Sequence, residues 1–350
     1  MKEARGIVLI CFPFAAGVAL AQFCPPFPIQ LSLAAVSALL LAALSGRLSG
    51  AGWYALLFAS LGSFCGASPA IAEGAGGGIP ALAMEHLSLL IRGLPFAHEG
   101  TSPLLLALLT GQRGDLVPDL VAAFRSAGAS HILALSGLHL GIIYLILGKV
   151  LALLGRSRIA GIVRSVLVVA ACAFYAVMTG AGPSIVRALL FVAINEALRH
   201  SPGRRRSLLA IWCCALVIQL AVSPWVIRSV GFQLSYLAML GIVTLFPELD
   251  AWFPSEGRYS GPMKRIWSAM ALTVSCQLFT APLVWLRFHS FPTHFLLTNM
   301  LALPLVSMLM LCAVATLVLT AAGLCPGLLI VATDSFAYGL KTVIGIIASL

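Results

Sequence analysis

Long apolar stretches separated by short polar breaks fill most of this sequence. A helix needs about 20 apolar residues to cross the hydrocarbon core of a bilayer, and eleven stretches reach or approach that length. They are 6–24, 29–45, 51–72, 130–154, 161–181, 183–198, 207–223, 227–247, 266–286, 294–323 and 327–350. The pattern predicts an all-α polytopic integral membrane protein with about ten or eleven transmembrane helices.

The longest polar break separates the third stretch from the fourth. It covers residues 73–102 and begins with a glycine-rich run. Apolar residues then recur at helical spacing, with charges between them, over 79–92, 104–110 and 116–124. This pattern is typical of short helices that lie in the membrane interface. We therefore expect N-terminal transmembrane helices over 1–72, an extracytoplasmic linker with an amphipathic segment over 73–102, and a transmembrane domain over 103–350.

Composition agrees with a membrane protein and excludes other classes. Hydrophobic residues make up 61% of the 350 residues and charged residues only 9%, whereas an ordinary soluble domain has about 25% charged residues. Mean hydropathy is +1.05. A water-soluble globule, a disordered chain, a collagen and a disulfide-stapled secreted domain are all excluded by these values.

The net charge of +10 is explained mainly by topology. Lys and Arg collect in short cytoplasmic loops, and a cytoplasmic N-terminus places most of the 21 Lys and Arg residues on that side. The same orientation puts residues 73–129 and the C-terminus outside. We expect a multi-pass protein of the cytoplasmic (inner) membrane whose first stretch is retained as a helix, although it resembles a signal peptide.

Polar residues inside apolar stretches are informative, because each is costly in lipid and marks a protein interior or a water-filled path. Ser136 and His139 are three residues apart and so share one face of a helix over 130–154. Gly137 and Gly141 allow another backbone to approach that helix closely. A helix-packing seam with a satisfied histidine is the alternative interpretation of the same residues.

Pro183 begins a second polar cluster. It starts a helix whose first two turns carry Ser184 and Arg187 on one face. Free backbone N–H groups at a helix start, with an arginine one turn further on, favour binding of an anion such as phosphate. Pairing of Arg187 with Glu196 or with a backbone carbonyl is the alternative.

Single polar residues mark the later stretches, and each suits an ordinary interhelical hydrogen bond as well as a polar path. They are Gln233, Gln277 and Asn299. The sequence contains no P-loop and no H-E-x-x-H motif, and its nine cysteines form no CxxC pair. It therefore predicts no ATPase site, no metal site and no cofactor.

In this order, the clusters resemble the competence domain of ComEC-type DNA-uptake channels. The resemblance covers about residues 103–325, and residues 1–72 are similar to the N-terminal spans of that family. The blocks that carry it are 109–114, 124–128, 131–139, 182–188, 231–235 and 277–282 with Asn299.

The resemblance implies a membrane channel that conducts single-stranded DNA into the cell during natural transformation. A single strand needs donors or positive charge for its phosphates and aromatic faces for its bases. Tyr236 or Trp285 would stack bases. The donors along the path would be Ser136, His139, His131, Ser184, Arg187, Gln233, Gln277 and Asn299.

Two domains common in that family have no counterpart in this sequence. About 30 residues stand where an OB-like domain is expected, too few for a five-stranded barrel, and no histidine-rich motif of a metallo-β-lactamase-like domain occurs. We therefore expect a channel without enzymatic activity, embedded in membrane lipids. A DNA receptor, nuclease and motor ATPase would be separate proteins or lie on a continuation of the chain. The sequence does not decide between a monomer and a homodimer.

Two other function classes compete with the channel. A small-solute or lipid-intermediate transporter predicts inverted repeats, and the sequence shows no convincing internal symmetry. An intramembrane serine hydrolase would use Ser136 as its nucleophile, with His289 or His294 as the base from another helix. The residues before Ser136 lack the leading glycine of the rhomboid motif G-x-S-G.

Overall fold

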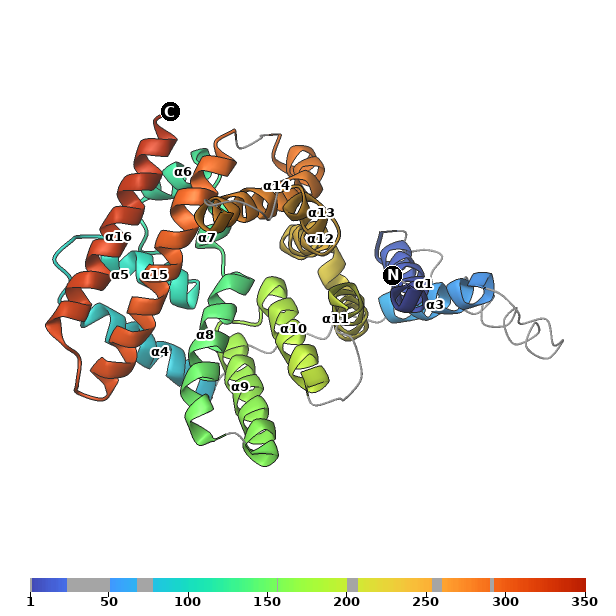
Figure 1. Cartoon of the computed structure of the whole chain (residues 1–350), viewed down its shortest axis with the longest axis horizontal. Helices are drawn as coiled ribbons and strands as arrows, with labels where there is room; N and C mark the ends of the chain where they lie inside the picture. The colour runs from blue at the N-terminus through green and yellow to red at the C-terminus, as the bar shows by residue number, and fades with distance from the viewer. Residues whose placement is uncertain are drawn as a thin grey trace. The chain divides into compact units, whose positions relative to one another are not determined.

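The computed structural model in Figure 1 describes residues 2–23, 51–67, 78–155, 157–199, 207–253, 260–289 and 293–350. Regular structure in these ranges is helical throughout. Six of the helices are long and apolar enough to cross a membrane, and four shorter apolar helices accompany them. The prediction of an all-α polytopic membrane protein is confirmed. The predicted stretch 29–45 lies outside the described residues.

The chain packs as two compact units. The first contains the described residues within 1–74 and 190–247, and the second contains those within 75–189 and 248–350. The N-terminal helices therefore pack with residues from the middle of the chain. Local sequence patterns could not indicate this grouping, because it depends on contacts between distant segments.

In the first unit, α1 (Lys2–Phe23) packs along α3 (Ala51–Gly66). Glycines permit this close approach: a Cβ on Gly17 would overlap the backbone of Ala59, and one on Gly62 would overlap the backbone of Phe14. Small residues at helix contacts are the usual way in which membrane helices come close together.

The rest of the first unit continues from α11 (Leu208–Val222), which packs against α1, through the 3-10 helix η2 (Pro224–Arg228) to α12 (Val230–Thr244). The Trp212 indole donates a hydrogen bond to the Tyr236 carbonyl at 3.1 Å. The Tyr236 hydroxyl donates to Gln219 Oε1 at 2.8 Å. These buried polar groups are therefore satisfied inside a helical core.

The second unit is built on α15 (Phe295–Ala321) and α16 (Gly327–Ala348), which run side by side (Figure 1). Among the helices that pack against α15 are α14 (Ser260–Phe288) and α8 (Gly137–Val150). The 3-10 helix η1 (Leu151–Leu154) follows α8, and α9 (Arg158–Met178) packs against both. The short helix α13 (Phe246–Ala251) precedes α14, and the Lys264 ammonium lies 3.0 Å from the Asp250 carboxylate.

Three short helices of the second unit occupy the positions that sequence periodicity predicts. They are α4 (Ile79–Arg92), α5 (Thr101–Thr110) and α6 (Pro118–Ser126). The structure shows no amphipathic surface helix at α5, because Leu104 to Leu109 are at most 3% exposed and lie in one core with Leu309 and Leu340. Apolar residues surround this helix on every side, and α15 and α16 cover it.

Two of the predicted polar clusters lie at interruptions between helices and not within continuous membrane spans. The predicted stretch 130–154 divides into α7 (Ser130–Leu133) and α8, with Ala134 and Ser136 in extended conformation between them. Between α9 and α10 (Pro183–Arg199), Gly180 and Ala181 have positive φ angles of 83° and 49°. Interrupted helices are tolerated in membranes where the backbone is buried in protein or lines a water-filled cavity.

Candidate functional site

Ser136 and His139 together form the start of α8. Ser136 is the N-cap, and its hydroxyl accepts a hydrogen bond from the Leu138 N–H at 3.2 Å. His139 Nδ1 accepts one from the Ser136 N–H at 3.0 Å. The two side chains meet, with Ser136 Oγ 3.1 Å from His139 Nδ1. The expected shared helix face is replaced by reciprocal capping, because Ser136 stands before the first residue of α8.

The capping contact also determines which histidine nitrogen carries the proton. Because Nδ1 accepts a hydrogen bond, the neutral ring of His139 has its proton on Nε2. His139 is 1% exposed, and Nε2 has no hydrogen-bond partner among the described residues. A buried N–H donor therefore remains on α8 for water or a ligand.

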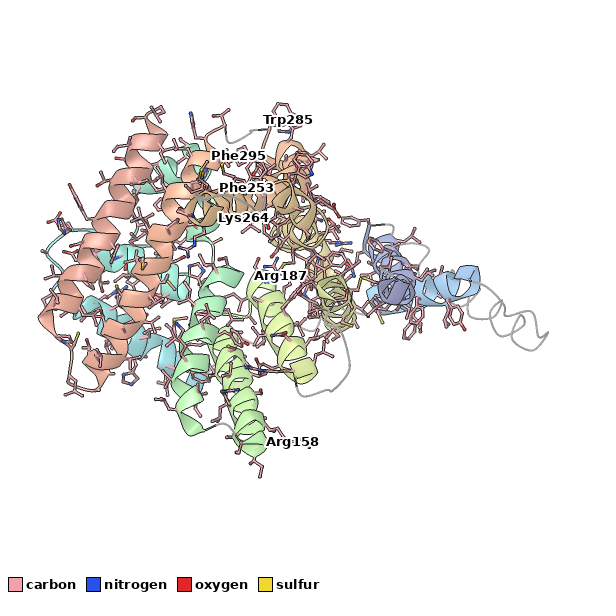
Figure 2. All side chains as sticks on the ribbon, viewed as in Figure 1. Arg158, Arg187, Phe253, Lys264, Trp285 and Phe295 are labelled. Carbon is pink, nitrogen blue, oxygen red and sulfur yellow. The ribbon has the colours of Figure 1, made fainter. Side chains whose placement is uncertain are left out.

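Arg187 lies in the second turn of α10 and is 8% exposed (Figure 2). It reaches the first turn of α8, since a Cβ added to Gly137 would lie 3.2 Å from Arg187 Nη2. The same atom would lie 3.4 Å from the Ala188 Cβ. Gly137 thus allows the starts of α8 and α10 to meet.

Gly141 has no such role among the described residues. A Cβ added there would meet no atom within 4 Å. The expectation that another backbone approaches closely at Gly141 is therefore wrong. One turn beyond Gly137, this side of α8 has no described neighbour.

A third helix adds to the surroundings of Arg187. The Cys276 thiol of α14 lies within electrostatic range of the guanidinium, and Gln277 is the next residue. Pro183 begins α10 as predicted, and Ser184 follows it in the first turn, half-buried. Residues of α8 and α14 therefore lie near the buried guanidinium at the start of α10. A buried cation is costly in apolar surroundings unless polar groups solvate it.

Several predicted path residues carry buried polar atoms that lack a hydrogen-bond partner within the described part of the chain. They include His139 Nε2, Gln277 Nε2 and Asn299 Oδ1. Buried polar groups are normally satisfied, and each exception costs about 1–3 kcal/mol. Such atoms on α8, α14 and α15 are the groups that water or a polar ligand in a path would satisfy.

Other predicted residues do not join this cluster. Gln233 belongs to the first unit, where its Nε2 donates to the Ile227 carbonyl at 2.7 Å and ties α12 to η2. His131 lies on α7 with an exposed side chain. Tyr236 is only 4% exposed, so its ring offers no free stacking face, whereas Trp285 of α14 is 57% exposed.

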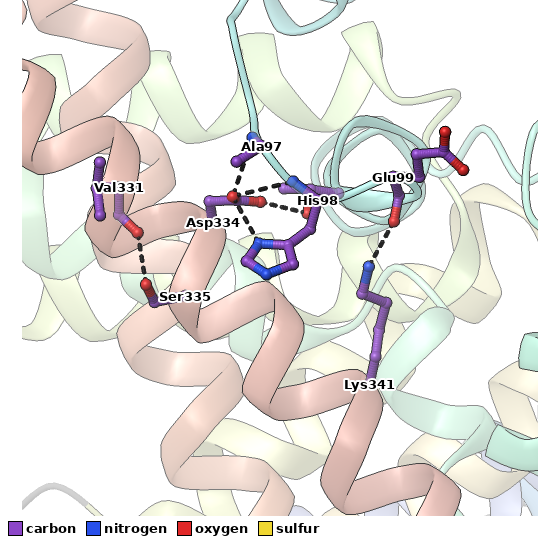
Figure 3. A network of polar contacts seen from close by, with 8 residues as sticks. Ala97, His98, Glu99, Val331, Asp334, Ser335 and Lys341 are labelled. Atoms are coloured by element: carbon purple, nitrogen blue, oxygen red, sulfur yellow. Dashed lines mark hydrogen bonds and ion pairs between the residues drawn. The ribbon is translucent and has the colours of Figure 1, made fainter.

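A second polar cluster of the same unit has no counterpart among the sequence predictions (Figure 3). Asp334 Oδ2 on α16 accepts hydrogen bonds from the Ala97 N–H at 3.0 Å and the His98 N–H at 3.1 Å. His98 Nδ1 donates to the same oxygen at 2.8 Å, and the Thr101 hydroxyl donates to Oδ1 at 2.7 Å. Asp334, an acidic residue inside the apolar stretch 327–350, is the signal by which the sequence could have indicated this cluster.

The contact between Gly137 and Arg187 makes a prediction about substitutions on α8. Gly137→Ala places a methyl group against the guanidinium and displaces it, which we expect to lower any activity that depends on Arg187 several-fold. Overpacking of this kind costs about 1–3 kcal/mol. Gly141→Ala is the matched control and should leave both activity and thermal stability unchanged. Equal effects of the two substitutions would contradict this packing.

Comparisons with known proteins agree on one family. The family described as Competence protein matches residues 108–350. ComE operon protein 3 of Bacillus subtilis (strain 168) is 28% identical over 198 residues, which are 57% of this chain and 24% of that protein. Competence protein ComA of Neisseria gonorrhoeae is 30% identical over 178 residues, 49% of this chain and 25% of that protein.

A further relative is the uncharacterized protein YcaI of Escherichia coli (strain K12), 27% identical over 215 residues, 58% of this chain and 27% of that protein. This chain thus spans about a quarter of the length of the curated relatives that it matches. No solved structure matches it significantly. The region of the family match includes the starts of α8 and α10 with Ser136, His139 and Arg187.

Proposed function

The chain belongs to the competence protein family, and from this premise we propose that it conducts single-stranded DNA across the cytoplasmic membrane during natural transformation. The observation that carries the proposal is the position of Arg187. It is buried in a membrane protein, inside the region of the family match, where the starts of α8 and α10 meet.

The chemistry around Arg187 suits a phosphate backbone. A guanidinium presents a planar fork of donors that fits phosphate oxygens. The start of α10 adds backbone N–H groups with a partial positive charge. His139 Nε2 and Gln277 Nε2 are further donors in the same unit and lack a hydrogen-bond partner among the described residues. Such donors would bind a strand without regard to its sequence.

The channel is passive in this proposal. A DNA receptor, a nuclease and a motor ATPase would be separate proteins or lie on a continuation of the chain, and single-stranded DNA and membrane lipids are the direct partners. The N-terminus would lie in the cytoplasm and the C-terminus outside, because most Lys and Arg residues then fall on the cytoplasmic side.

Deletion of the gene tests the proposal. Labelled duplex DNA is supplied to the deleted host, and nuclease-protected label in the cytoplasm is compared with that of a plasmid-complemented strain. We expect deletion to abolish protected label, without loss of DNA binding at the cell surface, and the plasmid to restore it. Equal import with and without the gene would contradict the proposal and favour a small-solute or lipid-intermediate transporter.

A further inference from the structure

Two charged residues of α16, Asp334 and Lys341, lie well inside the helix. With a rise of 1.5 Å per residue, Asp334 lies about 10 Å and Lys341 about 21 Å from the start of a helix about 33 Å long. This helix is one of the candidate membrane spans. Charges at such depth are costly in hydrocarbon and typically face protein or water.

Non-helical backbone before α5 is bound to these two residues. Asp334 fixes residues 97 and 98 through their N–H groups and Thr101 through its hydroxyl. Lys341 Nζ donates a hydrogen bond to the Glu99 carbonyl at 2.7 Å. Non-helical backbone in a bilayer must be buried in protein or line a water-filled cavity, and the loop therefore has protein on the side of α16.

The other side of this loop is open. The His98 side chain is 43% exposed and Tyr338 of α16 is 51% exposed, whereas Asp334 is 4% exposed. Glu99 is also exposed. An ionised Glu99 side chain is unfavourable in hydrocarbon, which favours water on the open side of the cluster.

The exposed surface contains an ordered aromatic pair. The His98 and Tyr338 rings stack with centroids 4.5 Å apart and an angle of 26° between their planes. The Asp334 carboxylate holds His98 Nδ1, so the imidazole orientation is fixed before any ligand arrives. Lys341 follows Tyr338 by three residues and so lies on the same side of α16. The Glu99 carboxylate points away from the Lys341 ammonium (Figure 3).

We propose that His98, Tyr338 and Lys341 form a binding site for one nucleotide of single-stranded DNA. The base stacks on the aromatic pair, and the Lys341 ammonium contacts a phosphate. Asp334 is a positioning residue that holds His98. The site is separate from the Arg187 cluster in its residues, and it rests on the proposed function because it takes the same strand.

Binding of an oligonucleotide to the purified full chain tests this site. The anisotropy of a fluorescent oligo-dT is measured in detergent, together with photo-cross-linking of the same strand carrying 5-iodouracil. We expect Tyr338→Leu to weaken binding about tenfold, the loss that follows from removal of one base stack, and Tyr338→Phe to bind as tightly as the wild type. Cross-links are expected on the peptides that carry His98 or Tyr338.

Two further variants make the outcome unambiguous. Tyr54→Leu removes an exposed tyrosine of α3, 59% exposed, and should leave binding unchanged. Lys341→Gln should weaken binding and lower the slope of log affinity against log salt concentration by about one released counterion. This slope stays informative where Tyr338→Leu does not fold.

The outcomes separate this site from the channel itself. Equal binding by Tyr338→Leu and Tyr338→Phe, or an unchanged salt dependence in Lys341→Gln, would overturn the site while DNA import in cells stays intact. A wild-type chain that neither binds oligo-dT nor restores DNA import to the deleted host would overturn the site and the proposed function together.

Discussion

Replacing Arg187 with leucine is expected to reduce DNA import to the level of the deleted host. Leucine removes the buried charge, and it favours membrane insertion more than arginine does, so the protein should still reach the membrane. Arg187→Lys should retain import roughly tenfold below the wild type, because lysine keeps the charge but loses the planar fork of donors. Nuclease-protected cytoplasmic DNA measures the import, and immunoblots of washed membranes measure insertion.

Arg158→Leu is the matched control for this series. Arg158 lies at the start of α9 with an exposed side chain (Figure 2), so its loss should leave import unchanged. Equal import by Arg187→Leu and Arg187→Lys would contradict a role for the guanidinium in the path. Loss of import in both leucine variants, with import retained in Arg187→Lys, would point instead to a general effect of cationic charge.

Replacing Asp334 with alanine is expected to cause the largest loss of stability. The carboxylate accepts hydrogen bonds from the backbone of residues 97 and 98, from the His98 ring and from the Thr101 hydroxyl. Alanine leaves the buried Thr101 hydroxyl without this acceptor and releases the backbone of residues 97 and 98, at a cost of about 1–3 kcal/mol. Thermal unfolding of the purified protein in detergent should show a midpoint lower by several degrees.

Two control variants accompany Asp334→Ala. Ser335→Ala changes the next residue, whose exposed hydroxyl donates to the Val331 carbonyl at 2.8 Å within the same helix, and should leave the midpoint unchanged. Asp334→Asn keeps an acceptor oxygen and should fall between wild type and Asp334→Ala. An unchanged midpoint in Asp334→Ala would show that the loop before α5 is not held by this residue.

The elements that sequence predicts well are those with local signals. The amphipathic spacing of α4 and the proline at the start of α10 lie within the elements themselves. The burial of α5 has no local signal, because the residues that cover it belong to α15 and α16, far along the chain. The break before α8 was also hidden, since His139 stands where a capping box normally has Glu or Gln.

The candidate site follows the same distinction. Arg187 and His139 are conspicuous as polar residues in apolar stretches, and both are buried in the structure. Asp334 carries the same signal, but its partners Ala97 and His98 lie more than 200 residues away in sequence. Gln233 donates a hydrogen bond to the nearby Ile227 carbonyl. The sequence alone cannot show whether a glutamine in an apolar stretch makes such a local bond or lines a path.

Transport of DNA into vesicles containing only this protein tests the central claim most directly. The purified chain is reconstituted into liposomes that enclose a single-strand-binding protein as a trap. Fluorescent single-stranded DNA is added outside, and after incubation a nuclease is added to degrade the DNA that has not entered. We predict protected fluorescence with the wild type, none with Arg187→Leu and none with duplex DNA. Protected fluorescence that is equal in protein-free liposomes, or absent with correctly inserted wild-type protein, would contradict conduction of single-stranded DNA by this chain.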